Sequence, residues 1–357
     1  MNPTWQKTPS GKLRARGLGL ALPGTPGTNN AITDVAGVEV GYATLVSGDG
    51  ALKVGHGPVR TGVTAIFPRG RARAGHAVWA GAHSLNGNGE LTGAWWLEET
   101  GRCELAITIT NTHSCGTTRD ATLQWAVRQG LAGQQDWGLP VAAETFDGHL
   151  NDINGFHVKP EHAFEALDGA RGGPIEEGSV GGGTGMICYG LKGGSGTASR
   201  IVEEGGRWTL GCFVQANFGR TPELVVLGRP IGRDLAGKEL KGAGSIIVVL
   251  ATDAPLLPHQ LKRLARRATL GIGRTGTIGH NSSGDIFLAF TTANGAALLP
   301  SETPVAVETL PEDKMDGLFT AAVESVEEAI LNAMIANETM VGRDGHRIEA
   351  LPHSALK

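Results

Sequence analysis

The apolar positions of this 357-residue chain fall into short runs that glycine-rich turns separate. Runs of this kind, rich in β-branched residues, predict strands. The first two runs flank the turn Gly48-Asp49-Gly50, so they are expected to pair as a hairpin. The predicted strands span residues 37–44, 62–68, 105–111, 208–217, 224–228 and 286–290, and two more begin at Val141 and Ser245.

Apolar residues recur at helical spacing in four other segments. Thr118 is predicted as the N-cap of one helix, which should stop at Gly130. Pro258 lies near the start of an amphipathic helix that Gly271 should stop. The predicted helices span residues 118–129, 162–167, 258–270 and 313–334, whereas residues 1–30 are irregular and are interpreted as an arm.

Strands and helices alternate in two halves along the chain, which favours helices that cover two packed sheets in one α+β sandwich. The length alone allows one large domain or two. We interpret the whole chain, residues 1–357, as a single catalytic domain.

Composition narrows the class of protein. The chain is 40% hydrophobic and 18% charged, as in soluble globular proteins, and its net charge of −4 includes no long basic block. Nucleic acid is therefore not expected as a partner, and a small molecule or peptide is. Because no apolar stretch approaches the length of a membrane span, no membrane contact and a cytoplasmic location are expected. The four cysteines are widely spaced and should be buried free thiols.

Two glycine-rich segments are candidates for nucleotide-binding loops. Residues 178–196 lack the spacing of a phosphate-binding loop and are interpreted as tight backbone packing. Residues 271–276, GIGRTG, match the pattern GxGxxG but come after a helix, whereas the dinucleotide fingerprint leaves a strand and begins a helix. Neither segment predicts a cofactor.

The strongest candidate for chemistry is the bond between Gly244 and Ser245. If it were cut, Ser245 would carry a hydroxyl nucleophile and an α-amine whose ordinary pKa, near about 8, suits a general base. The polar segment 229–244 before it looks exposed and cleavable. On pattern alone, however, a glycine and serine before a strand are more commonly the end of a turn.

Other polar groups are candidates to join Ser245. Acids and amides crowd residues 144–154, which could line a cleft or form a solvated turn. Asn217 ends a predicted strand, and Ser283-Gly284-Asp285 precedes another. None of the eleven histidines lies in a recognised catalytic or metal motif; His280, near Ser283, could act as a base, but a lone histidine in a loop is more often structural or exposed.

Several long motifs resemble the DmpA-type family of L-aminopeptidases and D-amino-acid esterase-amidases, which includes the β-peptidyl aminopeptidases. They cover nearly the whole chain, and matches of this length rarely arise by chance. The motifs are RARGLG at 14–19, NNAITDVAGVEVG at 29–41, SIIVVLATDAPL at 245–256, PHQL at 258–261, GRDG at 342–345 and ALPH at 350–353.

The resemblance implies a four-layer αββα sandwich, similar to N-terminal-nucleophile hydrolases but with different connectivity. It also implies that the precursor cuts itself between Gly244 and Ser245, which gives an α chain of residues 1–244 and a β chain of residues 245–357. A glycine suits the scissile position, because it lacks a Cβ and can adopt strained geometry.

The resemblance also assigns roles to residues that match the family's motifs. Ser245 resembles the nucleophile, and Ser283 and Asp285 resemble the serine and the acid that assist it. Some relatives carry glutamate at the position of Asp285, so the reach of the shorter acid is in question. Asn217 resembles the side-chain donor of the oxyanion hole.

Two further residues are expected to bind substrate. Phe146 should supply a second oxyanion donor from its backbone N–H. Glu144 resembles the carboxylate that holds the free amine of the substrate, and a fixed negative charge there explains an aminopeptidase. Some relatives carry tyrosine or an aliphatic residue at position 146, so the choice between α- and β-amino acids stays open.

The leading hypothesis is a self-processing aminopeptidase that releases N-terminal residues from small peptides, amides or esters through an acyl-enzyme. It needs no metal or cofactor, and the family suggests a homo-oligomer, an octamer of four αβ units. One alternative is a hydrolase of non-peptide amides such as oligoamides, although such relatives use threonine as nucleophile. The other is an unprocessed, non-catalytic binding protein.

Overall fold

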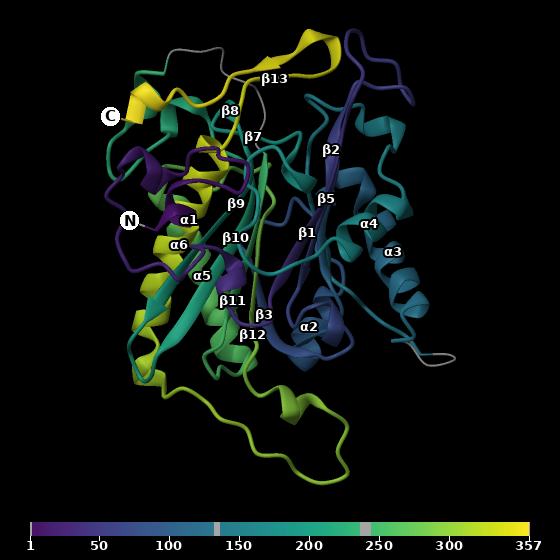
Figure 1. The fold of residues 1–357 in the computed structure, drawn as a ribbon, viewed down its shortest axis with the longest axis vertical. Helices are drawn as coiled ribbons and strands as arrows, with labels where there is room; N and C mark the ends of the chain where they lie inside the picture. Colours follow the sequence, from purple (N-terminus) through teal and green to yellow (C-terminus); the bar gives the residue numbers. More distant parts are fainter. Residues whose placement is uncertain (1, 132–135, 236–243, 357) are drawn as a thin grey trace.

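The computed structural model describes residues 2–131, 136–235 and 244–356, and these form two sheets with helices on their outer faces (Figure 1). The smaller sheet contains four strands in the order β1-β2-β5-β6. The first pair is antiparallel, as the hairpin prediction required, and the last pair is parallel. These strands are β1 (Glu39–Ser47), β2 (Val59–Phe67), β5 (Ile107–Asn111) and β6 (Ala142–Thr145).

The larger sheet contains six strands in the order β4-β3-β12-β11-β10-β9. Its two central strands, β11 and β12, are parallel, and each pairs antiparallel with its other neighbour. The strands are β3 (Val78–Ser84), β4 (Arg102–Cys103), β9 (Gly194–Val202), β10 (Trp208–Asn217), β11 (Ser245–Thr252) and β12 (Asp285–Thr291). Two short hairpins complete the strands: β7 (Ile187–Cys188) with β8 (Leu191–Lys192), and β13 (Met340–Val341) with β14 (Arg347–Ile348).

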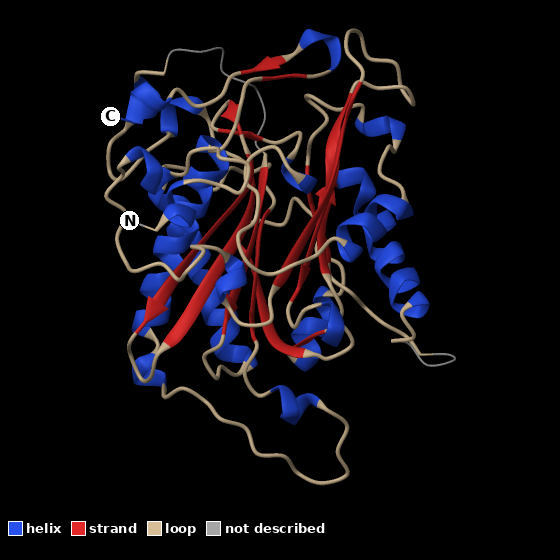
Figure 2. Ribbon diagram, viewed as in Figure 1, coloured by secondary structure: helices blue, strands red, loops and turns tan. Residues whose placement is uncertain are grey.

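The two sheets face each other, and each outer face is covered by helices (Figure 2). Side chains of alternate strand residues fill the space between the sheets, for example Ile109 of β5 with Ile247 and Val249 of β11. The helices α5 (Pro258–Arg274) and α6 (Asp316–Ile335) cover the larger sheet, and α3 (Cys115–Arg128) and α4 (Pro160–Asp168) cover the smaller one. Two short helices, α1 (Pro3–Gln6) and α2 (Ala94–Thr100), lie at the margins.

The mixed helix and sheet fold is confirmed, and most predicted elements lie where the apolar pattern places them. Residues 224–228 are an exception, because they form a turn and not a strand, with an isolated bridge between Val226 and Arg229. The strands β3 and β9 were missed. Glycine, serine and alanine interrupt their sequences, and these residues carry little strand propensity of their own.

Two predicted helix ends were wrong. Thr118 is not an N-cap, because α3 begins at Cys115 and Thr118 is buried inside it. Gly271 does not stop α5, which continues to Arg274. A Cβ at position 271 would lie 2.6 Å from the Cβ of Val326, so this glycine lets α5 and α6 approach closely. The GxGxxG match therefore falls on the last turn of a helix and the two residues after it.

The cysteines and the glycine-rich segment lie in the structure as predicted. All four cysteines are free and buried, as expected. The glycines of residues 178–196 pack tightly: a Cβ at Gly182 would lie 2.5 Å from the carbonyl oxygen of Ile109. In the described parts of the chain, no helix has both the length and the apolar character needed to cross a membrane.

Candidate active site

Ser245 is the first residue of β11, a central strand. It lies at the end of the larger sheet where β10 ends and where β11 and β12 begin. It pairs with Asn217, the last residue of β10. The next residue, Ile246, lies opposite Asp285, the first residue of β12. Sheet register therefore brings two polar segments, distant in the chain, to either side of the predicted nucleophile, which is only 6% exposed.

Gly244 packs directly against the backbone of Asn217. A Cβ at position 244 would lie 1.4 Å from the carbonyl oxygen of Asn217, so no larger residue fits without moving the end of the strand. The bond predicted to be cut thus lies at a position that only glycine can occupy. Half of the segment predicted to be exposed before it, residues 236–243 of 229–244, falls outside the described residues.

Ser283, Gly284 and Asp285 lie on the β12 side of Ser245. The Gly284 N–H donates to Ser245 Oγ at 3.1 Å, and Ser283 Oγ donates to Asp285 Oδ1 at 2.6 Å. The aspartate is therefore long enough to reach Ser283. Because the Ser283 hydroxyl is the donor in this hydrogen bond, the lone pairs of Ser283 Oγ remain available as acceptors.

The carboxylate of Asp285 is completely buried. Burial raises the pKa of Asp285 above its ordinary value, and hydrogen bonds from Ser283 and Asn86 offset only part of this effect. A carboxylate with a raised pKa binds a proton more strongly. Asp285 can therefore interact with a positive charge that develops beside Ser283.

On the β10 side, the amide of Asn217 is held at both ends. Its Oδ1 accepts from the Ile187 N–H at 2.8 Å, and its Nδ2 donates to the carbonyl oxygen of Phe146 at 3.0 Å. These contacts fix the orientation of the amide. Because an amide nitrogen carries two hydrogens, one N–H remains to stabilise a developing oxyanion.

Glu144 lies in β6, two residues before Phe146, and is only 3% exposed. Its Oε1 accepts from the Glu90 N–H at 3.0 Å, and its Oε2 accepts from Thr112 Oγ1. Burial raises the pKa of Glu144, and these two hydrogen bonds offset only part of the shift. Each oxygen retains a lone pair, so the carboxylate can still bind an ammonium group.

Sequence reasoning missed three residues that orient these groups: Asn86, Glu90 and Thr112. Their signal is weak because each acts through short polar contacts in a loop or at a strand end. The alternation of amides and glycines at 86–89 was a usable hint, since such a segment can lie close to other backbone.

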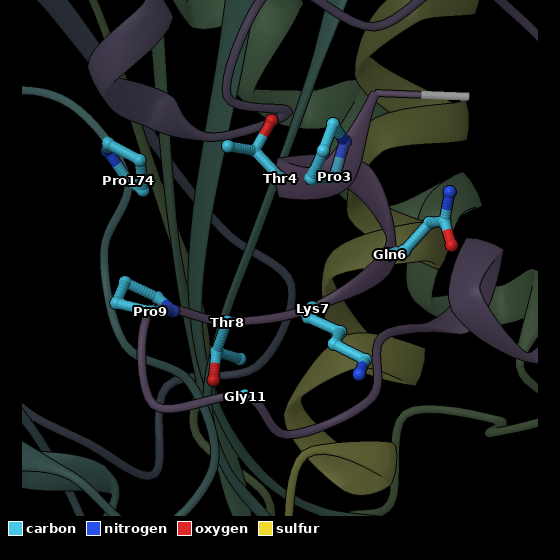
Figure 3. A pocket seen from close by; sticks show the side chains of 8 residues that line it. All are labelled: Pro3, Thr4, Gln6, Lys7, Thr8, Pro9, Gly11 and Pro174. Carbon is cyan, nitrogen blue, oxygen red and sulfur yellow. The ribbon is translucent and has the colours of Figure 1, made fainter.

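His280 was the alternative base, and the structure pairs its imidazole with Glu223. Its Nε2 lies 2.9 Å from Oε1 of Glu223, so it forms an ion pair or hydrogen bond there. A separate cavity of about 460 Å³ lies at the N-terminal arm (Figure 3) and contains none of the predicted site residues. Its lining is Pro3, Thr4, Gln6, Lys7, Thr8, Pro9, Gly11 and Pro174.

The structure thus gathers every predicted site residue near one end of the two sheets, with a buried serine beside amide, hydroxyl and backbone N–H groups. This arrangement is that of a serine hydrolase acting on amide or ester bonds. The profile of peptidase family S58 matches residues 30–348, and the chain belongs to this family.

Three relatives show how close the similarity is. The chain is 53% identical to the β-peptidyl aminopeptidase BapA of Sphingosinicella microcystinivorans, over 96% of this chain and 91% of that protein. The solved structure of the L-aminopeptidase D-Ala-esterase/amidase of Ochrobactrum anthropi has 47% identity and a TM-score of 0.89, and the match covers 96% of each chain. It is described as a prototype for the serine aminopeptidases and a new variant of the Ntn hydrolase fold. A Burkholderia sp. β-aminopeptidase has the same identity and TM-score and covers 96% of this chain and 97% of its own.

The family and these relatives confirm the prediction of a serine-type aminopeptidase. They also confirm the resemblance on which that prediction rested.

Proposed function

We propose that the protein cuts its own chain between Gly244 and Ser245 and then acts as an N-terminal-serine aminopeptidase. The products, residues 1–244 and 245–357, remain together as one catalytic domain. The observation that carries the proposal is the position of Ser245. This serine lies between Asn217 and Gly284, and the residue before it is a glycine whose surroundings leave no room for a Cβ.

Self-cleavage proceeds through the Ser245 hydroxyl. Its oxygen attacks the Gly244 carbonyl carbon, the bond to the Ser245 nitrogen breaks, and that nitrogen takes up the hydroxyl proton. The resulting ester between Gly244 and Ser245 is hydrolysed by water. Ser245 is left with a free hydroxyl and a free α-amine.

In turnover, this α-amine accepts the hydroxyl proton while Oγ attacks the substrate carbonyl, because its ordinary pKa near about 8 suits that task. The remaining N–H of Asn217 and the backbone N–H of Phe146 stabilise the oxyanion. The proton then passes to the leaving amine or alcohol, and water hydrolyses the acyl-enzyme. Ser283 and Asp285 accept hydrogen bonds from the charged α-amine and so stabilise it.

Glu144 selects the substrate by binding its free ammonium group. The substrates are therefore small peptides, amides or esters with an unblocked N-terminal residue. The relatives' names mention both β-peptides and D-alanyl esters or amides, and both classes carry such an amine. The choice between α- and β-amino acids then depends on how far Glu144 lies from Ser245.

The proposal also covers the finer architecture and the assembly. We infer a four-layer αββα sandwich, supported by a helix pair on each outer face of two stacked sheets. We further infer that processed αβ units assemble into a homo-oligomer, with four units as the size expected, in the cytoplasm. Light scattering on purified protein measures that size.

N-terminal sequencing of the purified protein tests the proposal. The expected result is a second N-terminus that reads Ser-Ile-Ile-Val and is absent from Ser245→Ala. Cleaved protein should hydrolyse alanine p-nitroanilide, β-alanine p-nitroanilide or both. Active protein with residues 244 and 245 still joined, or cleaved protein inactive on both compounds, would overturn the proposal.

A further inference from the structure

The loop of residues 86–90, Asn-Gly-Asn-Gly-Glu, connects β3 to the segment before α2 and contacts both halves of the site. One half is the nucleophile end, with Ser245 and Asp285. The other is the carboxylate of Glu144, which belongs to the opposite sheet.

At the nucleophile end, Asn86 binds Asp285 through both atoms of its amide. Its Oδ1 accepts from the Asp285 N–H at 2.6 Å, and its Nδ2 donates to Asp285 Oδ2 at 3.1 Å. The same nitrogen donates to the carbonyl oxygen of His280 at 3.1 Å. This end of the loop is therefore fixed relative to the start of β12.

At the other end, the backbone N–H of Glu90 donates to Glu144 Oε1 at 3.0 Å. A backbone donor is fixed by the chain on both sides, so it holds the carboxylate at one place. The loop thus connects two groups that must bind the same substrate, one at its amine and one at its carbonyl.

Gly89 lies between these ends. A Cβ at this position would be 3.2 Å from Glu144 Oε1, 3.3 Å from Ile286 Cδ1 and 3.5 Å from the Cα of Gly284. Gly284 in turn donates its N–H to Ser245 Oγ. Gly89 therefore lies between the carboxylate of Glu144 and the backbone of Gly284, which contacts the nucleophile.

We propose that the 86–90 loop is a spacer whose Gly89 sets the distance between the amine-binding Glu144 and Ser245, and thereby the length of aminoacyl backbone that the enzyme accepts. An α-aminoacyl group has one carbon between its nitrogen and the scissile carbonyl, and a β-aminoacyl group has two. The inference rests on the proposed function. Glu90 and Asn86 act as positioning residues at the two ends.

Gly89→Ala tests the spacer directly. The added methyl group would lie close enough to Glu144 Oε1 and Ile286 Cδ1 to displace them by a few tenths of an ångström, whereas the Cα of Gly284 is in ordinary contact. Displacement of the carboxylate away from Gly284 widens the gap and favours the longer substrate. The ratio of kcat/KM for β-alanine p-nitroanilide to that for alanine p-nitroanilide should rise about tenfold, since small misplacements near the reacting atoms have effects of this size. Self-cleavage involves no substrate amine, so the variant should still appear as two chains on a denaturing gel.

Gly87→Ala is the matched control. It lies in the same loop, and a Cβ there would have no atom within 4 Å, so its ratio should equal that of the unchanged protein. An unchanged ratio in cleaved, active Gly89→Ala overturns the spacer, and so does an equal shift in Gly87→Ala. If the unchanged protein is neither cleaved nor active, the proposed function fails instead.

Glu144→Asp provides a second measurement should Gly89→Ala not fold. Shortening the side chain by one methylene draws the carboxylate back towards β6, so the ratio should again move towards the β-alanine compound, on a lower absolute activity. A shift towards alanine would overturn the inference.

Discussion

The amide of Asn217 contacts the backbone of two other segments, and each contact uses a different atom. Ile187 holds the oxygen and Phe146 holds the nitrogen, so the amide cannot rotate without losing both hydrogen bonds. Preorganised donors of this kind stabilise a transition state without reorganising during the reaction. The single N–H left over is the one we assign to the oxyanion.

Asn217→Ala is therefore expected to slow self-cleavage and turnover together, each by about 10²- to 10³-fold, the usual cost of losing one oxyanion donor. The rate of appearance of two chains on a denaturing gel measures the first. The value of kcat in whatever fraction is cleaved measures the second. Processing at the normal rate would show that Asn217 does not contact the oxyanion.

Glu144→Gln should separate the two reactions. The variant keeps the shape of the side chain but loses the charge that binds the substrate ammonium. Because a charge-assisted hydrogen bond contributes about 1.5–3 kcal/mol, kcat/KM for aminoacyl p-nitroanilides should fall roughly 10- to 100-fold. Self-cleavage should proceed at the normal rate. A fall in both rates alike would place Glu144 in the common machinery and not at the amine.

Asp147 comes directly after Phe146 and predicts a pH dependence of stability. Burial raises its pKa to about 7, although hydrogen bonds from Thr61 and Asn151 oppose the shift. Between its ordinary pKa and about 7, the folded state binds more protons than the unfolded state. The free energy of unfolding therefore decreases as pH rises through this range.

Asp147→Asn removes this titration. The loss of thermal stability between pH 5 and pH 8 should be smaller in the variant than in the unchanged protein, as measured by the midpoint of unfolding at each pH. Asp120→Asn, which makes the same charge change on the surface, is the control and should leave the pH dependence unchanged. Parallel curves for Asp147→Asn and the unchanged protein would contradict the assignment.

At the scale of elements, close packing of α5 and α6 depends on one glycine. Gly271 faces Val326, whereas Gly273 in the same helix has no atom within 4 Å of a Cβ placed there. Gly271→Ala should lower the free energy of unfolding by about 1–3 kcal/mol through overpacking. Gly273→Ala should raise it by about 0.5–1 kcal/mol, since alanine is the better helix former.

Thermal unfolding of the two variants, both made in uncut Ser245→Ala protein, measures the difference. Equal effects at the two positions would mean that the helices can separate slightly at no cost. Opposite signs are the expected result.

The elements that could be predicted are those whose buried positions follow a local apolar pattern in the sequence. β10, β11 and α6 are of this kind, because most of their buried positions carry apolar side chains. β9 was not, because its residues GSGTASRIV fold as a strand through pairing with β10 and packing of glycine against α6. Long-range contacts of that kind leave no local pattern.

At the scale of the whole molecule, β11 is enclosed before any bond is cut. β10 and β12 pair with it on both sides, and its residues from Ile246 to Thr252 are buried. Releasing the β chain would expose this strand, α5 and α6 together. The two chains of the processed protein should therefore co-elute as a 1:1 species in native size-exclusion chromatography and separate only in denaturant. Dissociation on simple dilution would contradict this.

The site itself could be predicted only in part. Ser245, Asn217, Ser283 and Asp285 lie at strand ends, and sequence motifs mark them. The loop of residues 86–90 carries no such motif. It reaches the site because β3 happens to be the neighbour of β12, and neighbours in a sheet cannot be deduced from separate strands.

The order of strands in the larger sheet has a consequence for biosynthesis. Under the proposed mechanism, Ser245 gains Ser283, Gly284 and Asp285 as partners only when β12 is in place, and β12 emerges from the ribosome some time after the serine does. A nascent chain consequently holds an inert hydroxyl. Under that mechanism, the peptidase becomes active only once its C-terminal third has been translated and folded.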